Sequence, residues 1–193
     1  MDCTKPEFWE QRYRAGRMPW DCHGAPPALG EFLRSAGRAG SVLVPGCGSG
    51  YEVAAFHRHG WRPSAIDFSP AAVDRARGVL GKLGTAVQIA DFFADDVGGP
   101  FDLVYERTFL CSLPPERRPG YIRRVAMLLK PKGRLAGFFV YGNESEPPPF
   151  PLDETEAISL FSGFELIEDR PIPPEQSLPL FADRERWQVW QLT

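Results

Sequence analysis

The sequence has few of the residues from which disulfide frameworks and metal sites are built. Its four cysteines are widely spaced over 193 residues and include no Cys-x-x-Cys pair, and a chain of this length folds without disulfide bonds. The three histidines show no spacing typical of metal ligands. We therefore expect no disulfide framework and no metal, and we expect the reducing cytoplasm as the compartment.

Long apolar runs and an excess of one charge are also missing. No segment approaches the roughly 20 apolar residues that span a bilayer, and residues 1–6 are polar and lack the apolar core of a signal peptide. The formal net charge of -3 provides no attraction to nucleic acid or to an anionic membrane. We expect neither of these as a partner. We also expect a monomer, because no long apolar surface stripe is left over.

Apolar residues make up 43% of the chain, enough for the core of a single α/β domain over residues 1–193. From residue 41 onward, short β-branched or aliphatic runs alternate with longer amphipathic stretches, which is typical of βαβ units with a mostly parallel sheet. Seven strands are predicted, at residues 41–44, 63–67, 86–90, 101–106, 134–141, 164–169 and 185–192. Helices are predicted between them, at residues 51–59, 70–83, 116–129 and 153–161.

The strongest local signal is the apolar run 42–44 leading into residues 45–50, with the sequence Pro-Gly-Cys-Gly-Ser-Gly. Gly46 and Gly48 let the backbone approach a bound nucleotide closely. A third glycine follows two positions later and then Tyr51, whereas a loop that seats a pyrophosphate has the order Gly-x-Gly-x-x-Gly. The loop therefore suits a ligand without phosphates. The alternative is a tight strand-to-helix turn that needs glycines for backbone reasons alone.

Asp67 closes the second predicted strand at about 20 positions after the glycine loop, the interval at which doubly wound folds place an acidic residue on the ribose. Its alternative role is an N-cap for the helix that begins near Pro70. Ser69 already offers that cap, so the ribose role is favoured.

Asp91 and Phe92 follow the third predicted strand. An acid there can accept a hydrogen bond from the adenine amino group, and a phenylalanine can pack on the ring. The alternatives are a turn residue and a core residue. Their position at the carboxyl end of a strand, where open α/β sheets bind ligands, favours the binding role.

Taken in this order, the motifs resemble those of class I methyltransferases that use S-adenosylmethionine (SAM), and more closely those of the thiopurine S-methyltransferase family, which includes plant halide and thiol methyltransferases. The resemblance is carried by residues 8–13 with 19–21, by 43–48, by 101–107 and by 130–133. It implies a Rossmann-like α/β fold with a seven-stranded, mostly parallel sheet, helices on both faces and an N-terminal helical lid at residues 1–27. It also implies SAM as the cofactor and S-adenosylhomocysteine (SAH) as the product.

The resemblance places Trp9, Tyr13 and Trp20 in the lid over SAM. Trp9 and Tyr13 are four residues apart and share a helix face, while Trp20 follows a loop and can close from the side. Aromatic faces suit a sulfonium cation and exclude water. The alternative is that the three residues pack the N-terminal helix onto the domain. Many relatives carry tryptophan at the position of Tyr13.

The same resemblance places Glu106 around SAM and Arg107 beside the acceptor. Halide-type relatives tend to carry an aromatic residue at the position of Arg107, so the arginine favours a larger or anionic thiol as the acceptor. A buried arginine can hold a substrate anion or help to keep a thiol ionised. The alternative is a salt bridge with Glu106 or another carboxylate. Tyr141, at the end of the fifth predicted strand, is a further pocket candidate.

The predicted activity is methyl transfer from SAM to a small-molecule acceptor, with a thiol or thiopurine sulfur favoured. A thiolate needs no general base, so positioning and desolvation suffice. The alternatives are a halide, a selenium or tellurium oxyanion, or a nitrogen or oxygen acceptor, for which a base is usual. A SAM-binding sensor without activity is an alternative from another class. A nicotinamide-dependent oxidoreductase is disfavoured by Tyr51 and by the missing second domain.

Overall fold

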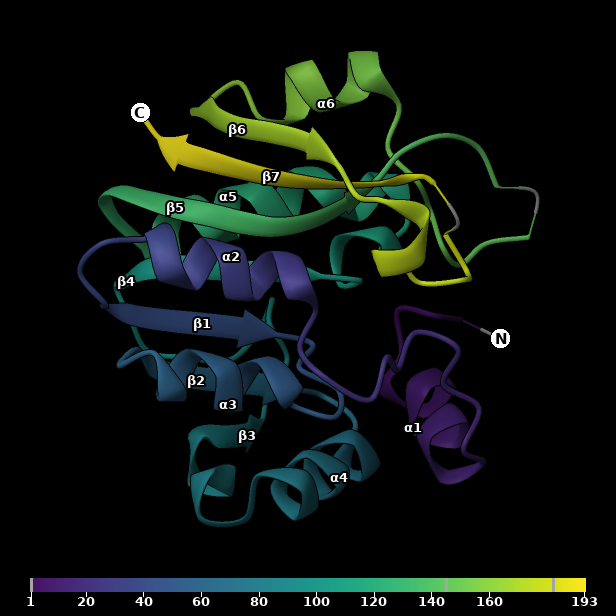
Figure 1. Cartoon of the computed structure of the whole chain (residues 1–193). Helices are drawn as coiled ribbons and strands as arrows, with labels where there is room; N and C mark the ends of the chain where they lie inside the picture. The colour runs from purple at the N-terminus through teal and green to yellow at the C-terminus, as the bar shows by residue number, and fades with distance from the viewer. Residues whose placement is uncertain (1, 145, 182) are drawn as a thin grey trace. The chain divides into compact units, whose positions relative to one another are not determined.

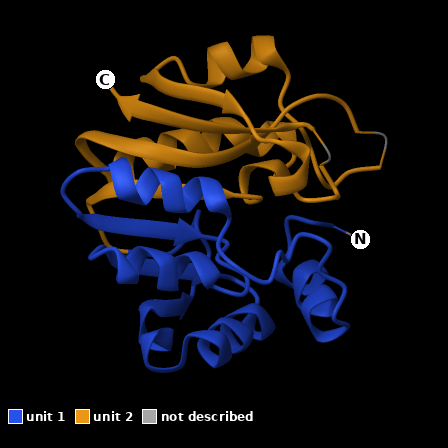
Figure 2. Cartoon of the chain, viewed as in Figure 1, with its two compact units in different colours: residues 1–97 blue, residues 98–193 orange. Residues whose placement is uncertain are grey.

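The computed structural model describes residues 2–144, 146–181 and 183–193 (Figure 1). The chain divides into two compact units, Met1–Val97 and Gly98–Thr193 (Figure 2). They contribute three and four of the seven strands, and the single domain predicted for residues 1–193 stays a prediction. No helix within the described ranges is long and apolar enough to cross a membrane.

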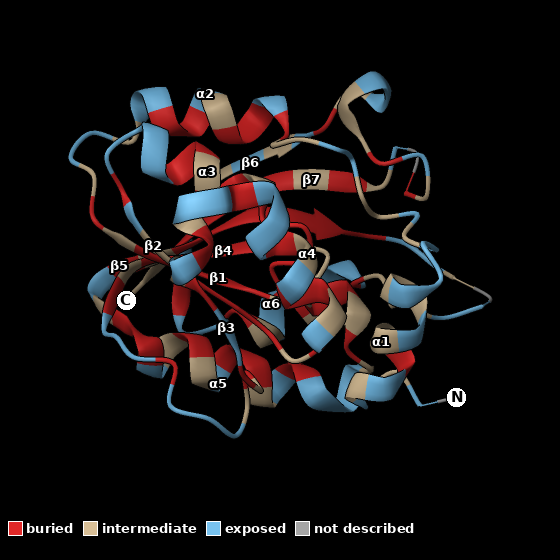
Figure 3. Cartoon of the chain, turned by 90° about the horizontal axis from the view of Figure 1, so that it is seen from below, coloured by how far each residue is buried: buried red, intermediate tan, exposed pale blue. Residues whose placement is uncertain are grey.

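The first unit contains three parallel strands in the order β3-β2-β1, with Val44 beside Ala65 and Ala65 beside Val87. In Figure 3 the most deeply buried residues follow the strands, and the outer surfaces of the helices are exposed. The helices α2, α3 and α4 form a continuous layer, since α2 contacts α3 and α3 contacts α4. The elements of this unit are α1 (Pro6–Arg14), α2 (Pro27–Ser35), β1 (Ser41–Pro45), α3 (Tyr51–Arg58), β2 (Arg62–Asp67), α4 (Pro70–Leu80) and β3 (Val87–Ile89).

α2 is absent from the predictions above, which place no helix between the N-terminal lid and the first strand. Pro27 occupies its first turn, where the missing N–H needs no partner. The buried side chains of α2 are Ala28, Leu29, Phe32 and Leu33, which form one helical stripe. The two consecutive prolines Pro26 and Pro27 are typical of a loop, so no helix was predicted here.

The second unit contains four strands in the order β4-β5-β7-β6. β4 and β5 are parallel, whereas β7 runs antiparallel to both β5 and β6. α5 packs on β4 and β5 and also contacts α6. The elements of this unit are β4 (Phe101–Arg107), α5 (Arg118–Leu128), β5 (Leu129–Val140), α6 (Glu154–Leu160), β6 (Phe164–Pro171) and β7 (Glu185–Leu192).

All seven predicted strands are present, and apart from α2 the differences lie at the ends of elements. The helix predicted over residues 70–83 ends at Leu80, because Gly81 takes a positive φ of 56° and a 3₁₀ turn follows. β5 starts at Leu129 instead of residue 134. The helix predicted over 116–129 begins at Arg118, after a 3₁₀ turn over Pro115–Arg117.

Candidate active site

The glycine loop and Asp67 meet at the carboxyl ends of two adjacent parallel strands. The pairing of Pro45 with Ile66 aligns these ends. Gly46, Gly48 and Gly50 have φ values of 58°, 53° and 75°, a region that residues with side chains rarely adopt. The Gly48 N–H donates to Asp67 Oδ2 at 3.1 Å. The three glycines are therefore required by the path of the loop, and that path brings its backbone onto the carboxylate.

Asp67 is a buried carboxylate with its orientation fixed by backbone donors. Its Oδ1 accepts the Ser69 N–H at 2.9 Å, and its Oδ2 accepts the Gly48 N–H. Burial raises the pKa of Asp67 to about 6, against the opposing effect of the N–H groups of Ser69, Gly48 and Phe68. The group is thus ionised at neutral pH. Each carboxylate oxygen has a second lone pair, so Asp67 can still accept hydrogen bonds from two hydroxyls of a ligand.

The predicted N-cap of α4 is confirmed. Ser69 has an extended backbone, and its Oγ accepts the Ala72 N–H at 3.2 Å. Asp67 therefore does not cap the helix at that position. Its carboxylate instead joins the turn at Ser69 to the glycine loop.

The three aromatic residues predicted to form the lid lie together in the first unit. The ring centroids of Trp9 and Trp20 are 5.3 Å apart and those of Tyr13 and Trp20 are 5.9 Å apart, both edge-to-face. Trp20 Nε1–H donates to the Tyr13 hydroxyl at 3.3 Å. Burial and the nearby charge of Asp67 raise the pKa of Tyr13, which is therefore a neutral phenol. The cluster is an apolar wall with a hydroxyl at one edge.

Tyr13 connects this cluster to the glycine loop. A Cβ placed on Gly48 would lie 2.7 Å from the Tyr13 hydroxyl oxygen, which is closer than van der Waals contact allows. Only glycine leaves room for Tyr13 at this point. The structure thus brings together Trp9, Tyr13, Trp20, Gly48 and Asp67. Contact of these residues with SAM stays a prediction.

Asp91 and Phe92 follow β3 and make local contacts. Asp91 Oδ1 accepts the Phe93 N–H at 2.7 Å, and the Asp91 N–H donates to Asp95 Oδ2 at 2.8 Å. Phe92 is buried, with its ring edge-to-face with that of Phe93 at 5.3 Å. This geometry agrees with the turn and core alternatives stated for these two residues. An adenine contact stays a prediction.

Glu106, in the second unit, is completely buried. Its Oε1 accepts the N–H groups of Phe109 and Leu110, both at 2.8 Å, and its Oε2 accepts the Tyr121 hydroxyl at 2.7 Å. Burial raises the pKa of Glu106 to about 7, although these three donors favour the charged form. Oε1 thus holds the turn after β4, in which Thr108 has a φ of 60°, and Oε2 joins this strand end to Tyr121 of α5. Such a conformation is strained for a β-branched residue and needs support of this kind.

The carboxylate that pairs with Arg107 is Glu185 and not Glu106. The Arg107 Nη1 lies 3.7 Å from Glu185 Oε1, and the guanidinium stacks 4.0 Å from the centroid of the Phe138 ring. Glu185 is fully buried, and its Oε2 accepts the Ser177 hydroxyl and the Leu178 N–H. Sequence reasoning missed Glu185. The strand itself gave little signal, because Arg186, Gln188 and Gln191 are polar as well.

Tyr141 and Arg107 lie on opposite faces of the strands. Arg107 stacks on Phe138, whereas the Tyr141 hydroxyl donates to Gln188 Oε1 at 3.1 Å and its ring lies below Arg186. In the β5–β7 register Gln188 pairs with Gly137, so it shares the face of odd-numbered β5 residues. Burial raises the pKa of Tyr141 to about 12. The two side chains thus lie on different faces, and a role of Tyr141 in the acceptor pocket stays a prediction.

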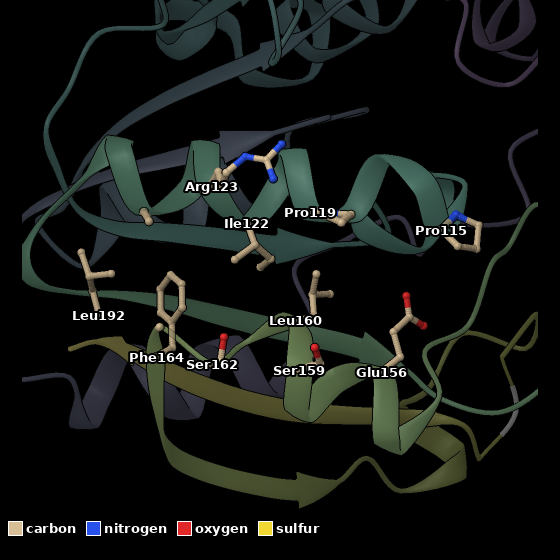
Figure 4. A pocket seen from close by; sticks show the side chains of 12 residues that line it. Pro115, Pro119, Ile122, Arg123, Glu156, Ser159, Leu160, Ser162, Phe164 and Leu192 are labelled. Atoms are coloured by element: carbon tan, nitrogen blue, oxygen red, sulfur yellow. The ribbon is translucent and has the colours of Figure 1, made fainter.

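The second unit also contains a groove of about 570 Å³ between α5 and the region from α6 to β6. Figure 4 shows Ile122 on one side of the groove, with Leu160 and Phe164 on the other. None of the predicted site residues lines it. Elsewhere, no group of three or more His, Cys, Asp or Glu side chains within the described ranges could hold a metal ion.

Comparison with known proteins identifies the family. Residues 4–191 match the family described as Thiopurine S-methyltransferase (TPMT). The chain belongs to the thiopurine S-methyltransferase family. Over 82% of this chain and 74% of the relative, it is 33% identical to a probable thiol methyltransferase 2 of Arabidopsis thaliana. It is 27% identical to thiocyanate methyltransferase 1 of the same plant, over 95% and 83% of the two chains. It is 29% identical to the thiopurine S-methyltransferase of Vibrio cholerae, over 96% of both chains.

Solved structures confirm the predicted fold class, a Rossmann-like α/β fold with a seven-stranded, mostly parallel sheet. The 1,6-didemethyltoxoflavin-N1-methyltransferase of Burkholderia thailandensis, with bound 1,6-didemethyltoxoflavin and SAH, has a TM-score of 0.78 at 20% identity and covers 97% of this chain and 87% of its own. The magnesium protoporphyrin IX methyltransferase of Synechocystis, with bound SAM, has a TM-score of 0.70 at 18% identity over 86% and 77%. The predicted class of enzyme is confirmed as well: this member of the thiopurine S-methyltransferase family is a SAM-dependent methyltransferase.

Proposed function

We propose that the chain methylates the sulfur of a small, neutral thiol. The observation that supports the cofactor side is the Asp67 carboxylate, which is buried and ionised and is oriented by the N–H groups of Gly48 and Ser69. Two vicinal hydroxyls of a ribose would satisfy the remaining lone pairs of its oxygens. SAM, when bound, supplies a methyl group activated by a sulfonium ion.

The aromatic cluster gives the chain a means of holding a cation and excluding water. The ring of Trp20 lies edge-to-face with the rings of Trp9 and Tyr13, and Tyr13 reaches the glycine loop. Aromatic faces attract a cation with about 0.5–2 kcal/mol each, depending on how far water is excluded. A thiol that has released its proton to water attacks the methyl group as the thiolate, and SAM leaves as SAH, so an aligned thiolate needs no general base. The site residues therefore need only to position the two reactants.

The ion pair of Arg107 with Glu185 supports an acceptor without charge, in place of the anionic thiol that Arg107 alone favours. Both side chains are buried, and their charged atoms are 3.7 Å apart, so the positive charge of the guanidinium is compensated inside the protein. A compensated arginine gives little attraction to an inorganic anion but still offers N–H donors to a neutral ligand. Similarity to relatives named for thiol, thiocyanate and thiopurine methylation supports sulfur as the acceptor atom.

The test is titration calorimetry of the purified protein with SAH, followed by a product assay with SAM and a panel of acceptors. The panel contains small thiols, thiopurines, thiocyanate and iodide. We expect SAH to bind and a neutral thiol or thiopurine to be methylated with the highest kcat/KM. Binding of SAH without turnover of any sulfur acceptor would refute the proposed acceptor, and failure to bind SAH would refute the cofactor site.

The substitution Glu185→Gln tests the charge argument. It keeps the size of the side chain but leaves the charge of Arg107 uncompensated, so an anionic acceptor should gain relative to a neutral one. We expect the ratio of kcat/KM for thiocyanate to that for a neutral thiol to rise about tenfold, which corresponds to about 1.4 kcal/mol. Steady-state kinetics on both acceptors measure it. The double variant Arg107→Met with Glu185→Gln is the control, and it should lose the gain for thiocyanate.

A further inference from the structure

Two carboxylates fasten the N-terminal segment to the rest of the first unit, and neither was singled out from the sequence. The first is Glu10 on α1. Its Oε2 accepts the Ser69 hydroxyl at 2.6 Å and the Ala71 N–H at 2.9 Å. Glu10 therefore supplies a second cap to the N-terminus of α4, where the unpaired N–H groups and the helix dipole favour a negative charge.

The second carboxylate is Asp21, which directly follows Trp20. Its Oδ2 accepts the Ser49 hydroxyl at 2.6 Å and Arg75 Nη2–H at 3.0 Å, while Arg75 Nε–H donates to Ser49 Oγ at 2.7 Å. Each of the three side chains thus bonds to the other two. The Asp21 side chain is only 5% exposed, although it lies outside any helix or strand.

The charge state of Asp21 suits this network. Burial opposes ionisation, but the hydrogen bonds from Ser49, from the His23 N–H and from Arg75 outweigh it and lower the pKa of Asp21. At neutral pH the group is an anion between a guanidinium and a hydroxyl. Charge-assisted hydrogen bonds of this kind are shorter and stronger than neutral ones.

The network joins the lid to the glycine loop. Asp21 holds Trp20, whose ring contacts Trp9 and Tyr13, and Ser49 is the residue between Gly48 and Gly50 in the loop. Trp20 cannot move away from the loop without breaking the bonds of Asp21 to Ser49 and Arg75. The anchor of α1 at Glu10 can remain during such a movement, because it uses other residues of α4.

We propose that Asp21, Ser49 and Arg75 form a latch that keeps the aromatic lid closed over the glycine loop and so sets the rate at which the cofactor and its product leave. The latch rests on the proposed cofactor site, whose residues it positions. Asp21 and Arg75 act through Trp20 and Ser49 and are positioning residues. Breaking the latch favours the open lid, so dissociation should accelerate while association changes little.

The experiment compares Asp21→Asn and Arg75→Gln with Asp74→Asn, a matched control on the exposed face of α4. Stopped-flow tryptophan fluorescence gives the association and dissociation rates of SAH for each folded variant. Trypsin cleavage after the exposed Arg17 reports opening of the segment without any ligand. We expect about a tenfold rise in the dissociation rate for both latch variants, since a hydrogen bond to a charged group contributes on this scale. We also expect faster cleavage, and no change for Asp74→Asn.

The double variant of Asp21→Asn with Arg75→Gln should dissociate SAH no faster than either single variant, because one network is lost in all three. If trypsin cleavage accelerates but the dissociation rate stays the same, the network is merely structural and the latch is refuted. Unchanged values of both refute it as well. Failure of the unsubstituted protein to bind SAH is a separate result that refutes the cofactor site itself. Ser49→Ala is the milder substitution if a charge change prevents folding.

Discussion

Replacing Asp67 with alanine is expected to weaken SAH binding by at least about 100-fold, because a buried carboxylate that receives two ligand hydroxyls contributes roughly 1.5–3 kcal/mol per hydrogen bond. The loss also removes the acceptor of the Gly48 N–H and leaves the loop without its fixed orientation. Titration calorimetry measures the effect. Asp74→Ala, on the exposed face of α4, is the matched control and should bind SAH as the unsubstituted protein does.

The pKa of Asp67 adds a pH signature that a merely structural role would not produce. Burial raises this pKa to about 6 in the protein without ligand, and only the ionised form accepts both hydroxyls. The dissociation constant of SAH should therefore increase about tenfold for each pH unit below 6. Asp67→Asn keeps one side-chain oxygen but does not titrate, so its weaker binding should be constant between pH 5 and 8. A parallel pH dependence in this variant would contradict the assignment.

Replacing Glu106 with alanine is expected to lower the free energy of unfolding by about 3 kcal/mol, since each buried donor left without an acceptor costs about 1–3 kcal/mol and relief of a buried charge offsets part of the loss. Three donors lose their acceptor: the N–H groups of Phe109 and Leu110 and the Tyr121 hydroxyl. Urea unfolding measures the change. A loss below about 1 kcal/mol, the scale of one ordinary hydrogen bond, would contradict the interpretation.

Glu106 also predicts how the stability of the protein depends on pH. Its pKa rises from the usual 4.5 when unfolded to about 7 when folded, so the folded state binds the proton more tightly. The stabilisation is complete below pH 4.5 and is lost as the pH rises through 7, by about 3 kcal/mol in total. Glu106→Gln should flatten this part of the profile and keep most of the stability at pH 8. If Glu106 only stabilises the turn after β4, Glu106→Gln should also leave the affinity for SAH unchanged.

The strands could be predicted because their signals are local, and signals of the same kind carry the prediction of the cofactor side of the site. The glycine loop and Asp67 each end an apolar run, and the pattern of the fold places such ends side by side. α2 was not predicted, because the two prolines at its start are as typical of a loop as of the first turn of a helix. The prediction of a lid over residues 1–27 came from the family resemblance.

The partners of charged residues could not be predicted, because they lie far apart in the sequence. Arg107 is separated from Glu185 by most of the second unit. The face on which Tyr141 lies can be compared with that of Arg107 only when the register of β5 against β7 is known. From the sequence alone, Arg107 and Tyr141 could lie on the same face of the strands. The structure separates them.

The double capping of α4 has a consequence for the order in which the protein is made. Residues 10 and 21 leave the ribosome before their partners, because the groups that hold Glu10 lie 59 and 61 residues later and Arg75 lies 54 residues after Asp21. A nascent chain emerging at about 5–20 residues per second would carry the lid unsecured for several seconds. Glu10 and Asp21 can therefore be fastened only after α4 has been made, and a premature stop before residue 69 would leave them without Ser69, Ala71 and Arg75.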